Sequence, residues 1–201
     1  TIPRRLAGRY LKIELLGISG SFDFVFDKLT FKTQTSVTNE APALASTTDP
    51  LVRDIYKVGL NSLKECMQTV YEDGPKRDRR LWIGDLYLEA LANAHTFKNH
   101  ELTKHCLYLL AAFANDEGLL HATLLEKPQP HPQYGTHTLD YCLIYNVALL
   151  EYLKETGDRE TANDLWPVVV RQIVAIHFSA SILFQYRLLP IIFQHFHYHL
   201  I

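Results

Sequence analysis

The sequence has little cysteine, almost no net charge and no uninterrupted hydrophobic run of membrane-spanning length. Its 201 residues include three cysteines, and opposed charges nearly cancel to a formal net charge of -2. Three widely spaced cysteines fit neither a closed disulfide framework nor a metal motif, so we expect Cys66, Cys106 and Cys142 to be buried free thiols. Balanced charge provides no overall field for nucleic acid or an anionic membrane, and neither is a predicted partner.

The chain also lacks an initiator methionine and a basic, apolar leader, because it starts at Thr1. We therefore expect it to continue a longer sequence. What it does have is a 47% share of hydrophobic residues. That share is sufficient for a globular domain with a sizeable core.

Residues 1–33 contain two stretches in which apolar side chains recur at every second position, a pattern typical of β-strands. Residues 11–15 and 22–26 alternate on either side of a Gly/Ser-rich turn, and this pattern predicts a hairpin. Because an isolated hairpin is marginal in water, we interpret it as the remnant of a sheet supplied by preceding sequence, or as a ribbon lying on helices. Residues 34–48 are polar, small and aperiodic, and are predicted to be a linker.

Helical periodicity dominates residues 49–176, so the predicted fold class is mainly α with about five helices. Asp49 before Pro50 indicates an N-cap followed by a first-turn proline, and this helix is expected to end near Tyr71. A later helix is apolar on nearly every face, which predicts burial. The helices after the first are expected over residues 79–97, 101–115, 138–155 and 158–176.

Residues 177–201 differ from the rest, with one charged residue, Arg187, and no amphipathic stripe. Gln185, Arg187 and Pro190 interrupt the apolar run, so a transmembrane helix is not predicted. The favoured interpretation is an apolar tail that packs on an exposed helix face, and an out-of-frame tail is the alternative. Alternating imidazoles could also hold a metal from one face of a strand. They belong to His195, His197 and His199.

Residues 72–85, EDGPKRDRRLWIGD, concentrate four acids and four bases around a Gly-Pro turn. A nucleic-acid patch would need uncompensated cations, and the acids cancel them. A salt-bridged surface loop is the ordinary alternative, but such pairs contribute only roughly 0–1 kcal/mol each. The third interpretation is a carbohydrate site, in which carboxylates and guanidinium groups bind hydroxyls and an aromatic ring covers the apolar face of the sugar. The segment supplies those groups in Asp73, Arg77, Asp78, Trp82 and Asp85.

The stretch DGPKRDRRLWIGD resembles the signature of the α-L-rhamnosidase glycoside hydrolases of family 78 type, Asp-x-Pro-x-Arg-Glu/Asp-Arg followed by Trp-x-Gly-Asp. RYLKIELLGISGSFDFVFDKLTF resembles the closing strands of the β-sandwich that precedes the catalytic domain in that family. TLDYCLIYNVALLEYLKETGDRETANDLWPVVVRQI resembles a later helical pair of its barrel. The likeness covers roughly residues 9–176.

The resemblance implies an (α/α)6 barrel that hydrolyses terminal α-L-rhamnosides with inversion and needs no metal or other cofactor. It places Asp78 as the general acid, where the family most often has the longer Glu. Asp73 and Arg77 would hold sugar hydroxyls, with Trp82 and Asp85 on the pocket wall. Weaker candidates for the pocket rim are Asp140 and Tyr141.

The same resemblance implies that the chain is a partial barrel, because the family's catalytic base lies beyond residue 176. We therefore expect a fragment that is inactive alone, with a rhamnoside as its partner. Incomplete burial of its helix faces also predicts self-association. Two alternatives stay open: a non-catalytic helical carbohydrate-binding or assembly module, and an α/α-barrel lyase acting on acidic polysaccharides.

Overall fold

The computed structural model describes the backbone of residues 5–183 and the side chains of residues 5–177. Among these residues it has five helices and three short strands, which confirms the predicted mainly helical fold. The elements are α1 (Pro50–Cys66), β1 (Leu81–Trp82), α2 (Ile83–His95), α3 (His100–Ala111), β2 (Thr123–Leu125), β3 (His131–Pro132), α4 (Leu139–Thr156) and α5 (Arg159–Leu183).

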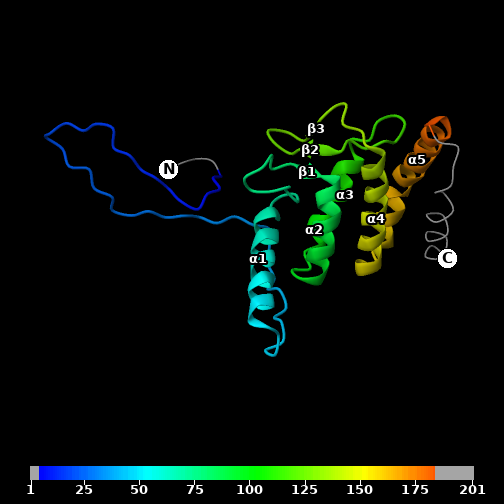
Figure 1. Cartoon of the computed structure of the whole chain (residues 1–201). Helices are drawn as coiled ribbons and strands as arrows, with labels where there is room; N and C mark the ends of the chain where they lie inside the picture. The colour runs from blue at the N-terminus through cyan, green and yellow to red at the C-terminus, as the bar shows by residue number, and fades with distance from the viewer. Residues whose placement is uncertain (1–4, 184–201) are drawn as a thin grey trace.

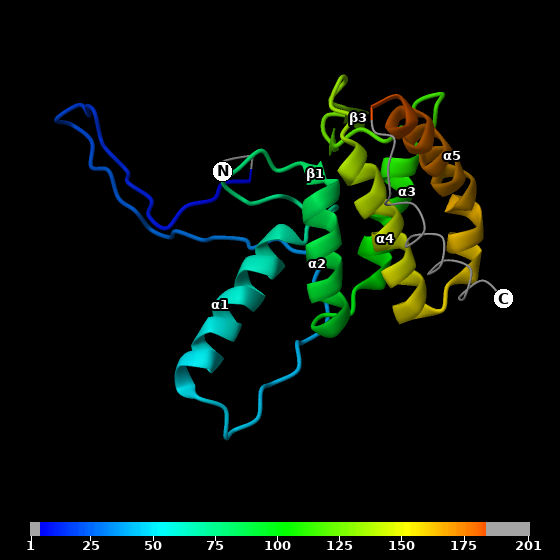
Figure 2. The same ribbon diagram turned by 45° about the vertical axis from the view of Figure 1, so that its right-hand side comes forward.

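The helices alternate in direction along the chain, and four of them form two layers. α2 packs most extensively on α4, while α3 and α5 pack behind this pair and on each other (Figure 1). α1 contacts α2 and then diverges from the bundle, as Figure 2 shows. Both α2 and α4 start at the end of the bundle where the three strands lie.

Local capping accounts for the helix boundaries. The Asp49 carboxylate accepts a hydrogen bond from the Leu51 amide at 2.8 Å, which confirms the predicted N-cap of α1. α1 ends at Cys66 instead of near Tyr71, because the chain turns back through a bridge between Met67 and Tyr71. Both of these side chains are fully buried. Core packing therefore ends α1 at Cys66, although the helical periodicity of the sequence continues beyond this residue.

The strands form one antiparallel sheet in the order β1-β2-β3. Leu81 pairs with Leu124, and Leu125 pairs with His131. The helix predicted from residue 79 therefore starts later, at Ile83, because β1 takes up its first residues. The Ile83 amide also donates to the Ala122 carbonyl at 3.1 Å, which ties the start of α2 to this sheet.

The hairpin expected over residues 11–33 is absent, since described residues 5–48 contain neither strand nor helix. The turn does form, with the Phe22 amide donating to the Ser19 carbonyl at 3.0 Å. Figure 1 shows this blue segment running out from the helices and back. Its phenylalanines are exposed, Phe24 by 54% and Phe26 by 56%. Without a third strand or a helix beneath them, two strands have too little to bury.

The predicted linker, residues 34–48, is attached to the bundle near its start. The Ser36 amide donates to the Met67 carbonyl at 2.9 Å, and the Asn39 side chain donates to the Phe97 carbonyl at 3.0 Å. At the other end of the chain, α5 continues to Leu183, past the boundary expected after residue 176. The alternating histidines of the predicted tail lie outside the described residues.

The core lies between α2, α3, α4 and the sheet. Its largest side chains include Tyr145, whose hydroxyl donates to the Leu107 carbonyl at 3.0 Å, so this buried phenol is satisfied. All three cysteines are free thiols, as predicted; Cys106 and Cys142 are buried, and Cys66 is partly buried. Within the described part of the chain, no helix combines the length and apolarity needed to span a membrane.

Candidate functional site

The charged segment forms a closed loop between α1 and β1. The Asp73 amide donates to the Arg80 carbonyl at 3.1 Å, and the Arg80 amide donates back to Asp73 Oδ1 at 3.1 Å. A turn closes the loop inside this pair, with the Arg77 amide donating to the Gly74 carbonyl at 3.1 Å. The segment is therefore an ordered loop at the start of α2.

Asp73 is the buried centre of this loop, with a side chain only 1% exposed. Asp73 Oδ1 accepts the hydrogen bond from the Arg80 amide, whereas the buried Oδ2 of Asp73 has no hydrogen-bond partner among the described residues. Arg77 Nε lies 3.6 Å from Oδ2, and its side chain is 72% exposed. The loop thus fixes a buried carboxylate oxygen beneath a cation that faces solvent.

Trp82 immediately precedes α2, and Asp85 lies in the first turn of this helix, near the Asp73 carboxylate. Trp82 occupies the N-cap position and is half-buried. Burial and the Asp73 charge raise the pKa of Asp85, and the Arg77 guanidinium opposes that rise. The structure therefore brings Asp73, Arg77 and Asp85 together. The N-terminus of α2 adds a favourable partial positive charge for anionic groups.

Tyr141, in the first turn of α4, packs against Gly84 at the start of α2. A Cβ added at Gly84 would lie only 3.0 Å from the Tyr141 hydroxyl and 3.1 Å from its Cζ. The glycine of the Trp-x-Gly-Asp stretch therefore makes room for the phenol against α2. Asp140, the neighbouring candidate, is exposed and contributes its negative charge near Cys142.

Asp78, the predicted general acid, is exposed on the outer part of the loop. The next residue, Arg79, has a left-handed backbone with φ 56°. Its guanidinium donates to the carbonyls of Pro75 at 2.8 Å and Arg5 at 3.1 Å. Arg79 therefore holds the loop and the N-terminal arm in place, while the carboxyl group of Asp78 faces solvent.

Glu89 is a further acid near this loop, and the sequence interpretation missed it. It lies on α2 one turn after Asp85, and burial followed by the charge of Asp85 raises its pKa to about 8. The signal available in the sequence was the Asp-x-x-x-Glu spacing, which puts both carboxyls on one helix face. Among the described residues, no group of three or more His, Cys, Asp or Glu has the arrangement of a metal site.

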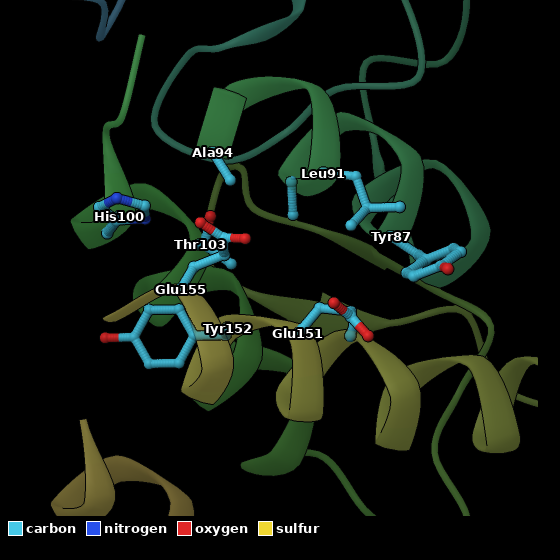
Figure 3. Close-up of a pocket in the computed structure, with 10 residues that line it drawn as sticks. Tyr87, Leu91, Ala94, His100, Thr103, Glu151, Tyr152 and Glu155 are labelled. Atoms are coloured by element: carbon cyan, nitrogen blue, oxygen red, sulfur yellow. The ribbon is translucent and has the colours of Figure 1, made fainter. Parts of the chain in front are cut away.

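A separate shallow hollow, open to solvent, lies farther along the helices (Figure 3). Tyr87, Leu91 and Ala94 of α2 face Glu151 and Tyr152 of α4 across it. The charged-loop residues are not among its lining residues. Its walls are mainly apolar and aromatic, and it was not predicted from the sequence.

Antiparallel helices that pair as hairpins, with an Asp- and Arg-containing loop before α2, make this a helical-hairpin domain. Residues 41–177 match the family described as the bacterial α-L-rhamnosidase six-hairpin glycosidase domain. This match covers more than half of the sequence, and the chain belongs to that family. No match was found among curated proteins.

Two solved structures support the assignment. A rhamnosidase from Klebsiella oxytoca with rhamnose bound is 44% identical, with a TM-score of 0.66, over 70% of this chain. A family 78 rhamnosidase of Bacillus sp. GL1 is 23% identical, with a TM-score of 0.61 over 69% of this chain, and shows the shared fold. The match covers 27% of the Klebsiella chain and 14% of the Bacillus chain.

Proposed function

We propose that the chain is part of a glycosidase that cleaves terminal α-L-rhamnosides with inversion, and that its charged loop supplies the acid half of the active site. The observation that carries this proposal is the cluster of Asp73, Arg77 and Asp85 beside Tyr141, formed by the signature residues themselves. The rhamnose bound to the similar Klebsiella rhamnosidase supports the choice of sugar.

In this proposal the Arg77 side chain moves aside, and the Asp73 carboxylate then accepts a hydrogen bond from a sugar hydroxyl through its unpartnered Oδ2. The exposed guanidinium of Arg77 donates to neighbouring hydroxyls, and Asp85 accepts from another at the start of α2. Fixed, partly desolvated partners of this kind bind sugars without needing opposite charge on the ligand. Trp82 and Tyr141 form the aromatic wall.

Asp78 is the proposed general acid, which protonates the leaving glycosidic oxygen. An inverting mechanism also needs a second carboxylate, roughly 6.5–9.5 Å away, that activates water on the opposite face of the sugar. We propose that this base lies beyond the barrel helices present here, since the match covers 27% of the Klebsiella chain. The 201-residue chain would then bind the sugar without turnover.

A non-catalytic carbohydrate-binding module is the second candidate. The observation that favours it is the exposure of Asp78, in contrast with the buried Asp73. A general acid is more effective when its surroundings hold the proton. In a binding module, Asp73, Arg77 and Asp85 would bind the sugar and Asp78 would have no chemical role.

Hydrolysis of an aryl α-L-rhamnoside tests the proposal, in the 201-residue chain and in the longer protein of which we propose it is part. We expect turnover only in the longer protein, with kcat lowered about 10²- to 10⁴-fold by Asp78→Asn. Asp54→Asn is the matched control, because this aspartate is 72% exposed on α1. Unchanged turnover in Asp78→Asn, or a product of retained configuration, would contradict the proposal. Saturable rhamnose binding without turnover in either form supports the module.

A further inference from the structure

Glu89 lies at the junction of α1, the charged loop and α2, yet the proposed hydrolysis assigns it no role. It follows Asp85 by four residues, so the two carboxyls lie on adjacent turns of the same face of α2. The Cys66 thiol at the end of α1 forms a hydrogen bond to the Glu89 carboxyl. Glu89 Oε2 is buried and has no hydrogen-bond partner among the described residues.

The titratable groups that interact electrostatically with Glu89 are acidic or neutral. They are Cys66 on α1, Tyr71, Glu72 and Asp73 in the loop, Asp85 on α2 and Cys106 on α3. Two arginines of this region are already paired with other carboxylates: Arg5 Nη1 donates to Glu72 Oε1 at 2.9 Å, and Arg77 lies against Asp73. An ionised Glu89 would therefore add negative charge to a cluster in which Arg5 and Arg77 already pair with other carboxylates.

Burial, followed by the Asp85 charge, raises the pKa of Glu89 to about 8, and the Cys66 hydrogen bond opposes this rise. Burial raises the pKa of the Cys66 thiol to about 12, so this thiol keeps its proton and acts as the donor. At neutral pH the glutamate is then an uncharged carboxylic acid. It adds no charge to the neighbouring carboxylates under those conditions.

We propose that Glu89 is a positioning residue of the sugar site: as a buried, protonated acid one helical turn from Asp85, it adds no charge beside Asp73 and Asp85 and leaves both carboxyl groups in position toward the sugar hydroxyls. This inference depends on the proposed rhamnose site. When Glu89 loses its proton, its charge repels Asp85 and attracts water to a buried position. The carboxylates that bind the hydroxyls are then displaced, and sugar affinity falls on the alkaline side.

Glu89→Gln tests this directly, because glutamine keeps the shape of the protonated acid and cannot ionise. L-Rhamnose binding is measured by calorimetry on the full 201-residue chain from pH 6 to pH 10, with circular dichroism at each pH to confirm folding. We expect wild-type affinity to fall about tenfold across the alkaline range, since one nearby unit charge is worth roughly that factor. Glu89→Gln should bind as wild type does at pH 6 and lose little affinity at pH 10. Glu117→Gln, at an exposed position, is the matched control and should follow wild type.

The outcomes separate the two proposals. If wild type and Glu89→Gln both bind rhamnose and lose affinity equally between pH 6 and pH 10, the proposed role of Glu89 is wrong and the proposed sugar site is unaffected. Absence of rhamnose binding at every pH overturns the proposed function and the positioning role with it. A 13C NMR titration of the Glu89 carboxyl gives a readout independent of sugar: a midpoint near pH 8 supports the proposal, and one near pH 4.5 overturns it.

Discussion

Replacing Glu89 by glutamine should change how the stability of the chain depends on pH. The pKa of Glu89 is about 8 in the folded chain, against an ordinary value of 4.5. Between these values the folded state holds a proton that the unfolded state has released. The free energy of unfolding must therefore decrease as pH rises through this window, and it levels off above about pH 8.

The magnitude follows from the same difference. Each pKa unit corresponds to about 1.4 kcal/mol, so moving from 4.5 to about 8 lowers the free energy of unfolding by at most roughly 5 kcal/mol. A loss of that size is comparable with the total stability of many domains. Glutamine removes the titration, so Glu89→Gln should gain stability relative to wild type as pH rises.

The assay is urea unfolding followed by circular dichroism at pH 5, 7 and 9. We expect Glu89→Gln to be close to wild type at pH 5 and more stable by about 2–5 kcal/mol at pH 9. Exposed Glu117→Gln should run parallel to wild type throughout. If wild type and Glu89→Gln lose stability equally between pH 5 and pH 9, the argument that Glu89 is buried and protonated is refuted.

Three further predictions concern single positions. Gly118→Ala should lower the free energy of unfolding by more than about 2 kcal/mol in thermal melts, because φ is +85° and the new Cβ would lie 2.3 Å from Arg171 Cβ. Gly157→Ala is the control. Its φ is +70° but the space around it is open, so the same measurement should show a loss of only about 1 kcal/mol. Asp158→Ala should cost about 1–2 kcal/mol, because Oδ1 accepts the Thr161 amide at 3.0 Å at the start of α5. Hydrogen bonds from Thr161 lower the pKa of Asp158, so the difference from wild type should shrink as pH falls below 3.8, and a difference independent of pH in acid would contradict this. Gly84→Ala should weaken rhamnose binding, measured by calorimetry, and change thermal stability little, because the new Cβ would lie 3.0 Å from the Tyr141 hydroxyl. Unchanged affinity would show that Tyr141 is not part of the proposed sugar site.

Local signals in the sequence placed the helices well. The Asp49-Pro50 pair located the start of α1 because capping depends on adjacent residues. The continuous apolar pattern over residues 138–155 corresponds closely to α4, Leu139–Thr156. The sheet could not be predicted in the same way. Its strands have two or three residues each, too few for a periodic pattern, and pairings such as Leu81 with Leu124 join distant segments.

The N-terminal hairpin shows the opposite case, in which local alternation was present and the strands did not form. Alternation describes which side chains would share a face, but a strand also needs a neighbouring strand or helix on which to bury that face. The exposed phenylalanines of residues 22–26 have no such surface here. The alternating pattern therefore indicated a preference for strands, but the described residues offer no sheet or helix surface against which those strands could pack.

The clustering of the charged segment was predictable because its spacing is short and local. Asp73, Arg77 and Asp85 do come together, and Tyr141 joins them from a helix more than fifty residues later. Glu89 was missed because its altered chemistry depends on burial under the end of α1 and on the Cys66 thiol. Neither can be inferred from its position four residues after Asp85 alone.

The central claim, that residues 73–85 and Tyr141 form a rhamnose site, is tested most directly by NMR chemical-shift mapping on the 15N-labelled 201-residue chain titrated with L-rhamnose. The account predicts saturable shifts at the amides of residues 73–85, 89 and 141, with little change around the separate hollow at Leu91, Glu151 and Tyr152. Shifts confined to that hollow, or no saturable shifts, would contradict it.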